Sequence, residues 1–132
     1  MKSTEEILDY YKNVLKWDPP FAQVLSKYCS DGLSGYLTMR EAAQTGPLPA
    51  KTRGLIFMVL DSIDNEVSGA RAHAAAAVEA GMTVEEITQT FVIVTIVKGI
   101  NVLCMAGVEA IEAAEKRASR VWNSRTWVRR SL

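Results

Sequence analysis

The chain contains a single histidine, His73, within the small-residue segment "NEVSGARAHAAAAVEAGMTVEEI" (residues 65–87). An imidazole is the side chain best suited to give and take protons near neutral pH. Glu66 lies seven residues before His73 and Gly69 lies four before it, so all three fall near one line along a helix. This spacing predicts a carboxylate two turns from the ring, with a gap between them that could admit a small ligand. We therefore take His73 and Glu66 as candidates for proton transfer, and Gly69 as the position that leaves room for a ligand.

The helix around His73 has an apolar stripe at helical spacing, with the imidazole about a quarter turn to one side. The stripe consists of Val67, Ala70, Ala74, Ala77 and Val78. Alanines allow neighbouring helices to come close and to shield the ring partly from water. A purely structural histidine, hydrogen-bonded to a backbone carbonyl at a subunit contact, is the alternative interpretation of the same spacing.

The elements that position His73 are all predicted to be helices. Capping boxes begin helices at Ser3 with Glu6 and at Thr83 with Glu86, and Gly81 is suited to end the His73 helix. The β-branched run "FVIVTIV" (residues 91–97) follows the second capping box, which favours a helix there. With 132 residues, 48% hydrophobic and 23% charged, we expect an all-α fold: a compact bundle of about six helices in one domain over residues 1–132.

The location of the protein is predicted from its apolar runs and cysteines. The N-terminal segment "MKSTEEILDYYKN" is acidic and polar, and the longest strongly apolar run has seven residues, which is too short to span a bilayer. Two widely separated cysteines, Cys29 and Cys104, suit free thiols in a reducing compartment, with a disulfide between them as the alternative. We expect a cytoplasmic protein without a membrane partner.

Charge is distributed unevenly along the chain, although the formal net charge is zero. All fifteen acidic residues lie at or before Glu115, whereas residues 116–132 form a basic tail that contains Trp122 and Trp127. Basic and aromatic side chains together can bind nucleic acid, but the acidic body would repel the same polyanion. We expect the tail to dock on an acidic neighbouring subunit instead.

The order of motifs resembles the carboxymuconolactone decarboxylase and alkylhydroperoxidase D-like family. The shared features are "K-x-R-x-L-I" from Lys51, the pattern "H-x7-G-M-T-x-E-E-I" from His73, and a glycine that begins the last helix. The resemblance covers residues 45–115, preceded by N-terminal helices in residues 1–44. It implies an all-α fold that assembles into homo-oligomers, commonly trimers or hexamers, with sites near subunit interfaces.

The thiol peroxidase branch of this family is excluded by its motif, C-x-x-C-x-x-x-H. The two cysteine positions hold Glu66 and Gly69 in this chain. The glutamate that completes the proton relay of those peroxidases aligns with Gly54. No sequence argument allows Cys29 or Cys104 to replace the redox pair.

The decarboxylase branch needs no thiol, metal or organic cofactor, and it implies a small-molecule substrate. On this resemblance His73 is the general acid or base and Glu66 orients its ring. The candidate substrate-binding residues are Lys98, Arg53, Lys51, Gly69 and Tyr36.

Two features leave the activity open. Where decarboxylases tend to have Y-x-G-x-P, this chain has Val97, Gly99 and Asn101, so a related reaction on another unsaturated carboxylated molecule is equally compatible. The segment "DSIDNE" (residues 61–66) is acidic, but with one histidine in the chain we expect no metal site. The alternative to a lyase is a non-catalytic helical oligomer that binds a small molecule or a protein partner.

Overall fold

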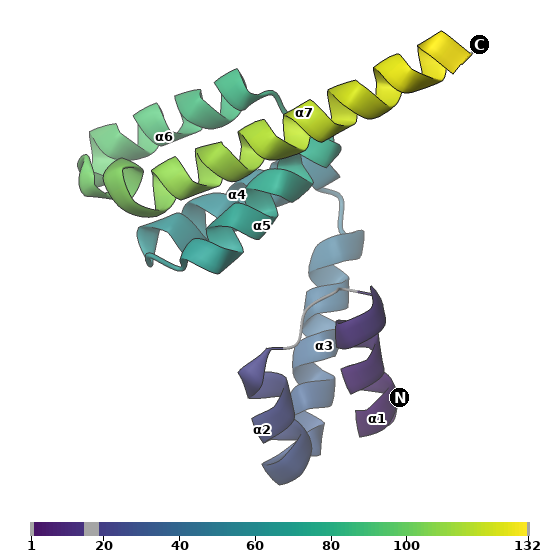
Figure 1. Cartoon of the computed structure of the whole chain (residues 1–132). Coiled ribbons are helices and arrows are strands. Elements are labelled where there is room, and N and C mark those ends of the chain that lie inside the picture. Colours follow the sequence, from purple (N-terminus) through teal and green to yellow (C-terminus); the bar gives the residue numbers. More distant parts are fainter. Residues whose placement is uncertain (1, 15–18, 132) are drawn as a thin grey trace. The chain divides into compact units, whose positions relative to one another are not determined.

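The computed structural model of the protein describes residues 2–14 and 19–131. These residues form seven α-helices and two π-helical turns, and none of them lies in a β-strand. The all-α prediction is confirmed, with one α-helix more than the expected six. The chain forms two compact units, Met1–Pro47 and Leu48–Leu132 (Figure 1). Gly46 follows the last helix of unit 1 and Pro49 precedes the first helix of unit 2.

Unit 1 is built around a small apolar core. Its elements are α1 (Thr4–Asp9), the π-helical turn η1 (Tyr10–Val14), α2 (Pro20–Tyr28) and α3 (Ser30–Thr45). The buried core side chains are Ile7, Tyr11, Ala22, Leu33 and Leu37. The predicted capping box is confirmed: the Glu6 N–H donates to Ser3 Oγ, and the Ser3 N–H donates to the Glu6 carboxylate.

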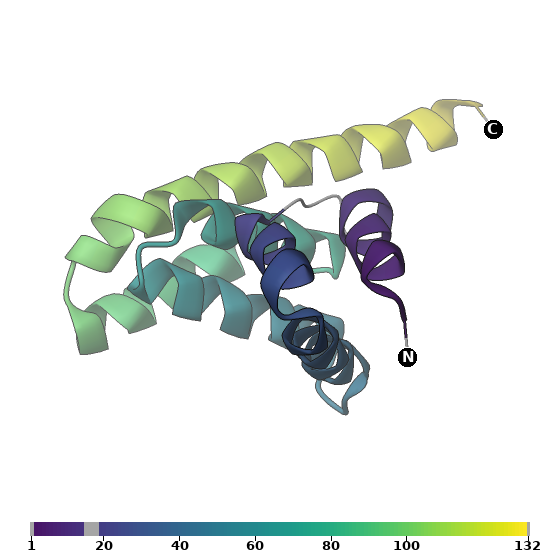
Figure 2. The same ribbon diagram turned by 90° about the horizontal axis from the view of Figure 1, so that it is seen from below.

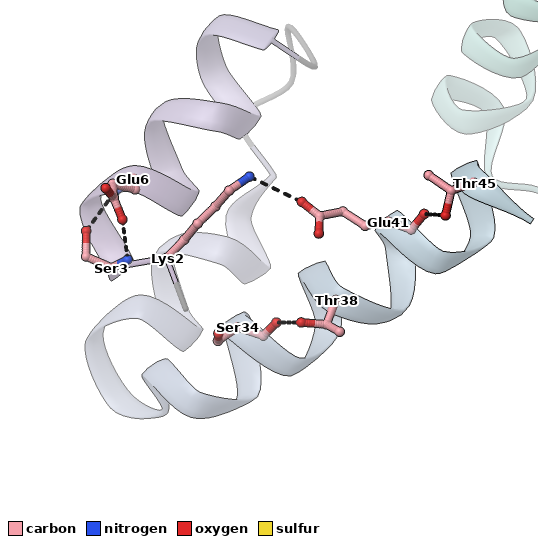
Figure 3. A network of polar contacts seen from close by, with 7 residues as sticks. All are labelled: Lys2, Ser3, Glu6, Ser34, Thr38, Glu41 and Thr45. Atoms are coloured by element: carbon pink, nitrogen blue, oxygen red, sulfur yellow. Dashed lines mark hydrogen bonds and ion pairs between the residues drawn. The ribbon is translucent and has the colours of Figure 1, made fainter.

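An ion pair joins the two ends of unit 1. Lys2 Nζ lies 3.2 Å from Glu41 on α3, and the same ammonium lies 4.4 Å from the centroid of the Tyr10 ring. Figure 3 shows that Lys2 reaches across from the residues before α1 to α3, where Thr38 and Thr45 donate to backbone carbonyls of their own helix. Both members of the pair are about half exposed, so it contributes little to stability.

The helix break in unit 1 lies at Cys29. The chain leaves helical geometry there, with φ −157° and ψ 71°, between α2 and α3. Asp31 in the first turn of α3 favours a new helix start, because a carboxylate there interacts well with the helix dipole.

Unit 2 contains the longer helices and the larger core. Its elements are α4 (Ala50–Ile63), α5 (Val67–Glu79), α6 (Val84–Lys98), the π-helical turn η2 (Leu103–Gly107) and α7 (Val108–Ser131). The core centres on α5, whose predicted stripe is buried at Ala70, Ala74, Ala77 and Val78 and half-buried at Val67. Met58, Phe91 and Ala110 bury their side chains against this stripe from α4, α6 and α7.

Close approach of α4 and α5 requires a glycine. A Cβ at Gly54 would lie only 3.3 Å from the Cα and Cβ of Ala77, which is tighter than ordinary van der Waals contact. On its other side α5 runs parallel to α7. Two ion pairs show this direction: Arg71 pairs with Glu109 and, eight residues later in each helix, Glu79 pairs with Arg117. The position of α5 between two neighbours is therefore fixed from both sides.

The start of α6 is fixed by local hydrogen bonds. Gly81 takes φ +105° after α5, and Thr83 and Glu86 form the predicted capping box. The β-branched run "FVIVTIV" is helical, as the capping box indicates. Lys51 at the start of α4 reaches the Glu86 carboxylate at 3.0 Å and so ties the two helix starts together. No helix in the described part of the chain is both long enough and apolar enough to cross a membrane.

The hydrogen bonds to Glu86 predict a pH-dependent stability. The Thr83 backbone N–H, and then Lys51, lower the pKa of Glu86 below its ordinary value of 4.5. A carboxyl with a lowered folded-state pKa stabilises the fold above its unfolded pKa, and this contribution is lost as the pH falls through the folded value. We expect Glu86→Gln to unfold at lower urea concentration than wild type at about pH 6, with the difference narrowing below about pH 4.

Glu85→Gln is the matched control, because it changes the same charge in the same helical turn. It should show a smaller difference from wild type at about pH 6. A gap between Glu86→Gln and wild type that stays constant over this pH range would contradict the assignment.

Candidate functional site

His73 lies in the middle of α5 with its ring against α4. The imidazole stacks on the Phe57 ring, with 4.7 Å between the ring centroids and 15° between the ring planes. About a fifth of the His73 side chain is exposed. The ring is thus held in one orientation by an aromatic face and still has access to solvent, which a group that exchanges protons with a small molecule requires.

A carboxylate accompanies the imidazole, and it belongs to Asp61. Asp61 lies one turn after Phe57 on α4, so both side chains face α5, and Asp61 Oδ2 is 3.6 Å from His73 Nε2. At this distance the two groups form an ion pair whenever the imidazole is protonated. The pair is partly shielded from water, since 29% of the Asp61 side chain is exposed. A nearby negative charge stabilises the imidazolium form of histidine.

Gly69 provides the space that the Asp61 carboxylate occupies. A Cβ at this position would lie 2.4 Å from Asp61 Oδ2 and 2.9 Å from Asp61 Cγ. Any residue larger than glycine at this position would force the Asp61 carboxylate to move. The space one turn before His73, which the sequence predicts to admit a small ligand, is filled by this carboxylate from α4.

Glu66 lies at the start of α5, and its Cγ is 3.3 Å from the position that a Cβ at Gly69 would take. It is the exposed N-cap residue of α5, and its carboxylate accepts a hydrogen bond of 2.9 Å from Ser68 Oγ. The carboxylate within ion-pair distance of His73 is Asp61, from the preceding helix. Helical spacing along one segment could not identify it, but an antiparallel pairing of residues 50–63 with residues 67–79 would have placed Asp61 opposite Gly69.

The three predicted cations differ in their surroundings. Lys51 is engaged by Glu86, and Lys98 is exposed in the last turn of α6. Arg53 lies one turn before Phe57 and two turns before Asp61, on the same side of α4. Its guanidinium donates through Nη1 to the Leu48 carbonyl, and its buried Nε has no hydrogen-bond partner among the residues that the structure describes. Arg53 is therefore the cation that shares a helix face with the His73 partners.

Tyr36, the remaining predicted site residue, belongs to unit 1. Its ring packs edge-on against Phe21, with 5.0 Å between the centroids. Nearby Tyr11 is buried, and this burial raises the pKa of its hydroxyl above the ordinary value of 10.0. Unit 1 also has an open groove of about 510 Å³ between Tyr10 and α3, lined by Leu37, Thr38, Arg40, Glu41, Ala42, Gln44 and Thr45. This groove contains none of the predicted site residues.

The remaining side chains that could carry chemistry are the two cysteines and the acidic residues. Cys29 lies in unit 1 and Cys104 in unit 2, and both are exposed free thiols. Within residues 2–14 and 19–131, no three His, Cys, Asp or Glu side chains are grouped closely enough to hold a metal ion.

Comparisons with known proteins agree with the fold and with the sequence motifs. The sequence model of the carboxymuconolactone decarboxylase family matches residues 31–118, about two thirds of the chain. A crystal structure from Burkholderia xenovorans LB400, provisionally identified as a carboxymuconolactone decarboxylase, is 26% identical in sequence with a TM-score of 0.77. The alignment covers 92% of this chain and 98% of that one. None of the curated proteins matches the chain.

The contact between Gly69 and Asp61 predicts the effect of adding one methyl group. In Gly69→Ala the Asp61 carboxylate has to rotate away from the imidazole. Rotation of a side-chain end costs little, and alanine favours a helix by up to about 1 kcal/mol over glycine, so the unfolding free energy should stay within about 1 kcal/mol of wild type. The His73 ring protons, the only histidine signals in the ¹H NMR spectrum, should titrate at lower pH because a neighbouring negative charge has moved away.

Gly35→Ala is the control for this experiment, because a Cβ there meets no atom within 4 Å. It should leave the His73 titration unchanged. An identical titration curve for wild type and Gly69→Ala would show that Asp61 does not act on the ring.

Proposed function

Because the chain belongs to the carboxymuconolactone decarboxylase family, we propose that it is a cofactor-independent lyase with His73 as its general acid or base. The substrate would be a small unsaturated carboxylated molecule or lactone. The observation that carries this proposal is the His73 imidazole held between the Phe57 ring and the Asp61 carboxylate. This is the only histidine of the chain, and it is oriented, paired with an acid and open to solvent.

The reaction needs a proton at carbon and a place for negative charge. When the carbon–carboxylate bond of a conjugated lactone breaks, carbon dioxide leaves and the bonding electrons move into the conjugated carbonyl. Protonation at carbon then restores a neutral product. A positioned imidazolium can deliver that proton, and general acid catalysis contributes typically ~10²–10⁴-fold. Holding the substrate in place supplies much of the remaining rate enhancement.

Asp61 acts in this proposal as the positioning residue for His73. Its charge stabilises the imidazolium and restricts rotation of the ring, which the Phe57 stack also opposes. We assign this part to Asp61 rather than to Glu66, because the Glu66 carboxylate bonds to Ser68 at the start of α5.

Arg53 is the cation that we propose for the substrate carboxylate. It shares the α4 face with Phe57 and Asp61, and its buried Nε has a hydrogen-bond donor to offer. Arginine binds carboxylates with two parallel hydrogen bonds, which fixes their orientation. Lys51 is less suitable because Glu86 already pairs with it, and Lys98 and Tyr36 stay secondary candidates for the same binding role.

One observation favours the alternative of a binding protein without catalysis. Gly54 occupies the position at which the peroxidase branch of the family has its relay glutamate. Ala77 fills the space beside Gly54. A site that has lost one acid could bind a small molecule or a partner without turning it over. The two functions differ in whether a proton passes through His73.

We also propose that the protein is a homo-oligomer in the cytoplasm. The outer face of α6 carries four exposed apolar side chains, Val92, Ile93, Ile96 and Val97, with exposed fractions from 51% to 80%. The opposite face of α6 packs in the core through Ile87, Phe91 and Val94. A helix that is apolar on both faces is normally covered on both, so a second copy is the proposed cover.

The catalytic proposal predicts a large loss of turnover on removing the imidazole. A screen of small unsaturated carboxylates and lactones, read by carbon dioxide release and by NMR proton exchange, supplies the substrate. With that substrate, His73→Ala should lower kcat by ~10² or more while the fold is retained. Asp61→Asn should shift the acid limb of the pH profile, and Glu66→Gln should have a smaller effect than Asp61→Asn.

The structural interpretation of His73 predicts a different pattern. If His73→Ala melts far earlier and loses activity only in proportion to the folded fraction, the imidazole is a structural bridge. The binding alternative would then replace the lyase.

The assembly proposal predicts a mass above that of one 14.5 kDa chain in light scattering at micromolar concentration. Val97→Glu places a charge on the exposed face of α6 and should shift the mass toward one chain. Val24→Glu, the same substitution at an exposed valine of α2 in unit 1, is the matched control and should leave the mass unchanged. A wild-type mass of one chain would refute the assembly.

A further inference from the structure

The last part of α7 extends beyond the helices that pack against it. The pairing of Glu79 with Arg117 marks the end of α5, and α7 continues to Ser131. Figures 1 and 2 both show the final turns of α7 running on past the other helices of unit 2. At 1.5 Å per residue, the segment 119–131 is about 20 Å long.

The composition of this extension indicates a partner. Trp122 and Trp127 are 68% and 72% exposed, so two large apolar side chains of this segment have most of their surface in solvent. Isolated helices of about 12 residues are marginally stable in water. Exposed tryptophans with neighbouring arginines are typical of the energetic centres of protein interfaces.

The charges of unit 2 are separated along the sequence. No acidic residue follows Glu115, whereas Arg120, Arg125, Arg129 and Arg130 all lie in the extension. The first two basic residues of the tail, Lys116 and Arg117, are already paired with Glu112 and Glu79. With these two included, residues 48–118 contain nine acidic and six basic residues, a net charge of −3. The helical extension and the body of the unit that carries it therefore have complementary charges.

A continuous helix that leads away from its own body cannot fold back onto it. We propose that residues 119–131 dock on the acidic surface of unit 2 in a second copy of the chain. This inference rests on the homo-oligomer proposed above and adds a specific segment and its electrostatic partner. The tryptophans would bury apolar area, and the arginines would set the orientation.

Two other anionic partners fit the structure less well. Nucleic acid would have to approach an acidic body that carries the helix, and this repels a polyanion. A lipid surface takes a helix with a separate apolar face, but Trp122 and Arg129 are seven residues apart and share one side of α7. A second copy of the chain is favoured because its unit 2 has a net charge opposite to that of the extension. It is also always present at the same concentration as the extension itself.

The test is a charge reversal in the extension, measured by sedimentation at several protein and salt concentrations. Arg125→Glu with Arg129→Glu should weaken assembly by about tenfold at low salt, and the difference from wild type should shrink at high salt. The matched control is Lys12→Glu with Lys27→Glu, which makes the same change of charge in unit 1 and should not alter assembly. In a Trp17→Phe background, the emission of Trp122 and Trp127 should shift to shorter wavelength as the protein assembles.

Several outcomes would overturn the inference. If the arginine variant assembles as the control does, the docking is wrong although the homo-oligomer stands. If wild type is a single chain at all concentrations, both proposals fail. A blue-shifted emission that does not depend on protein concentration means that the extension packs within its own chain. Tight binding of a single-stranded oligonucleotide or of anionic lipid vesicles that is lost in the arginine variant, without a change in assembly, assigns the helix to that partner instead.

Discussion

The contact between α4 and α5 determines the rest of the site. Gly54 lets the two helices approach until its Cα faces Ala77, and this closeness brings the Phe57 ring and the Asp61 carboxylate to the imidazole. A Cβ at position 54 would require the backbones of the two helices to move apart by a few tenths of an ångström at Ala77, and the contacts of His73 with both partners would loosen. The chemistry of the site therefore depends on the absence of a side chain one helical turn away.

The alanines of α5 that permit this approach have an energetic cost. Burial of apolar surface contributes about 25 cal/mol per Å², and an alanine has little surface to bury. The core of unit 2 relies on a few large side chains, such as Met58, Ile87 and Phe91. A bundle built this way leaves much of its apolar surface outside, on α6 and on the end of α7, where a second chain can cover it.

Local signals predict much of this fold, whereas contacts between helices limit the prediction of the site. The capping boxes at Ser3 and Thr83 mark helix starts because their hydrogen bonds join residues three apart, and the burial of Ala70, Ala74 and Ala77 follows from helical spacing. Asp61 could not be chosen over Glu66 in the same way, since its place beside His73 arises from the packing of two helices. The end of α2 before Cys29 and the continuation of α7 to Ser131 likewise could not be predicted from a local stop signal.

The space at Gly69 couples the chemistry of position 69 to that of position 61. A cysteine at position 69, as the peroxidase motif requires, brings a Cβ to within 2.4 Å of the Asp61 carboxylate. The carboxylate would then have to rotate away from the imidazole, so a chain with that cysteine could keep Asp61 only without its present contact to His73. A thiol at position 69 and the Asp61–His73 pair therefore compete for one space.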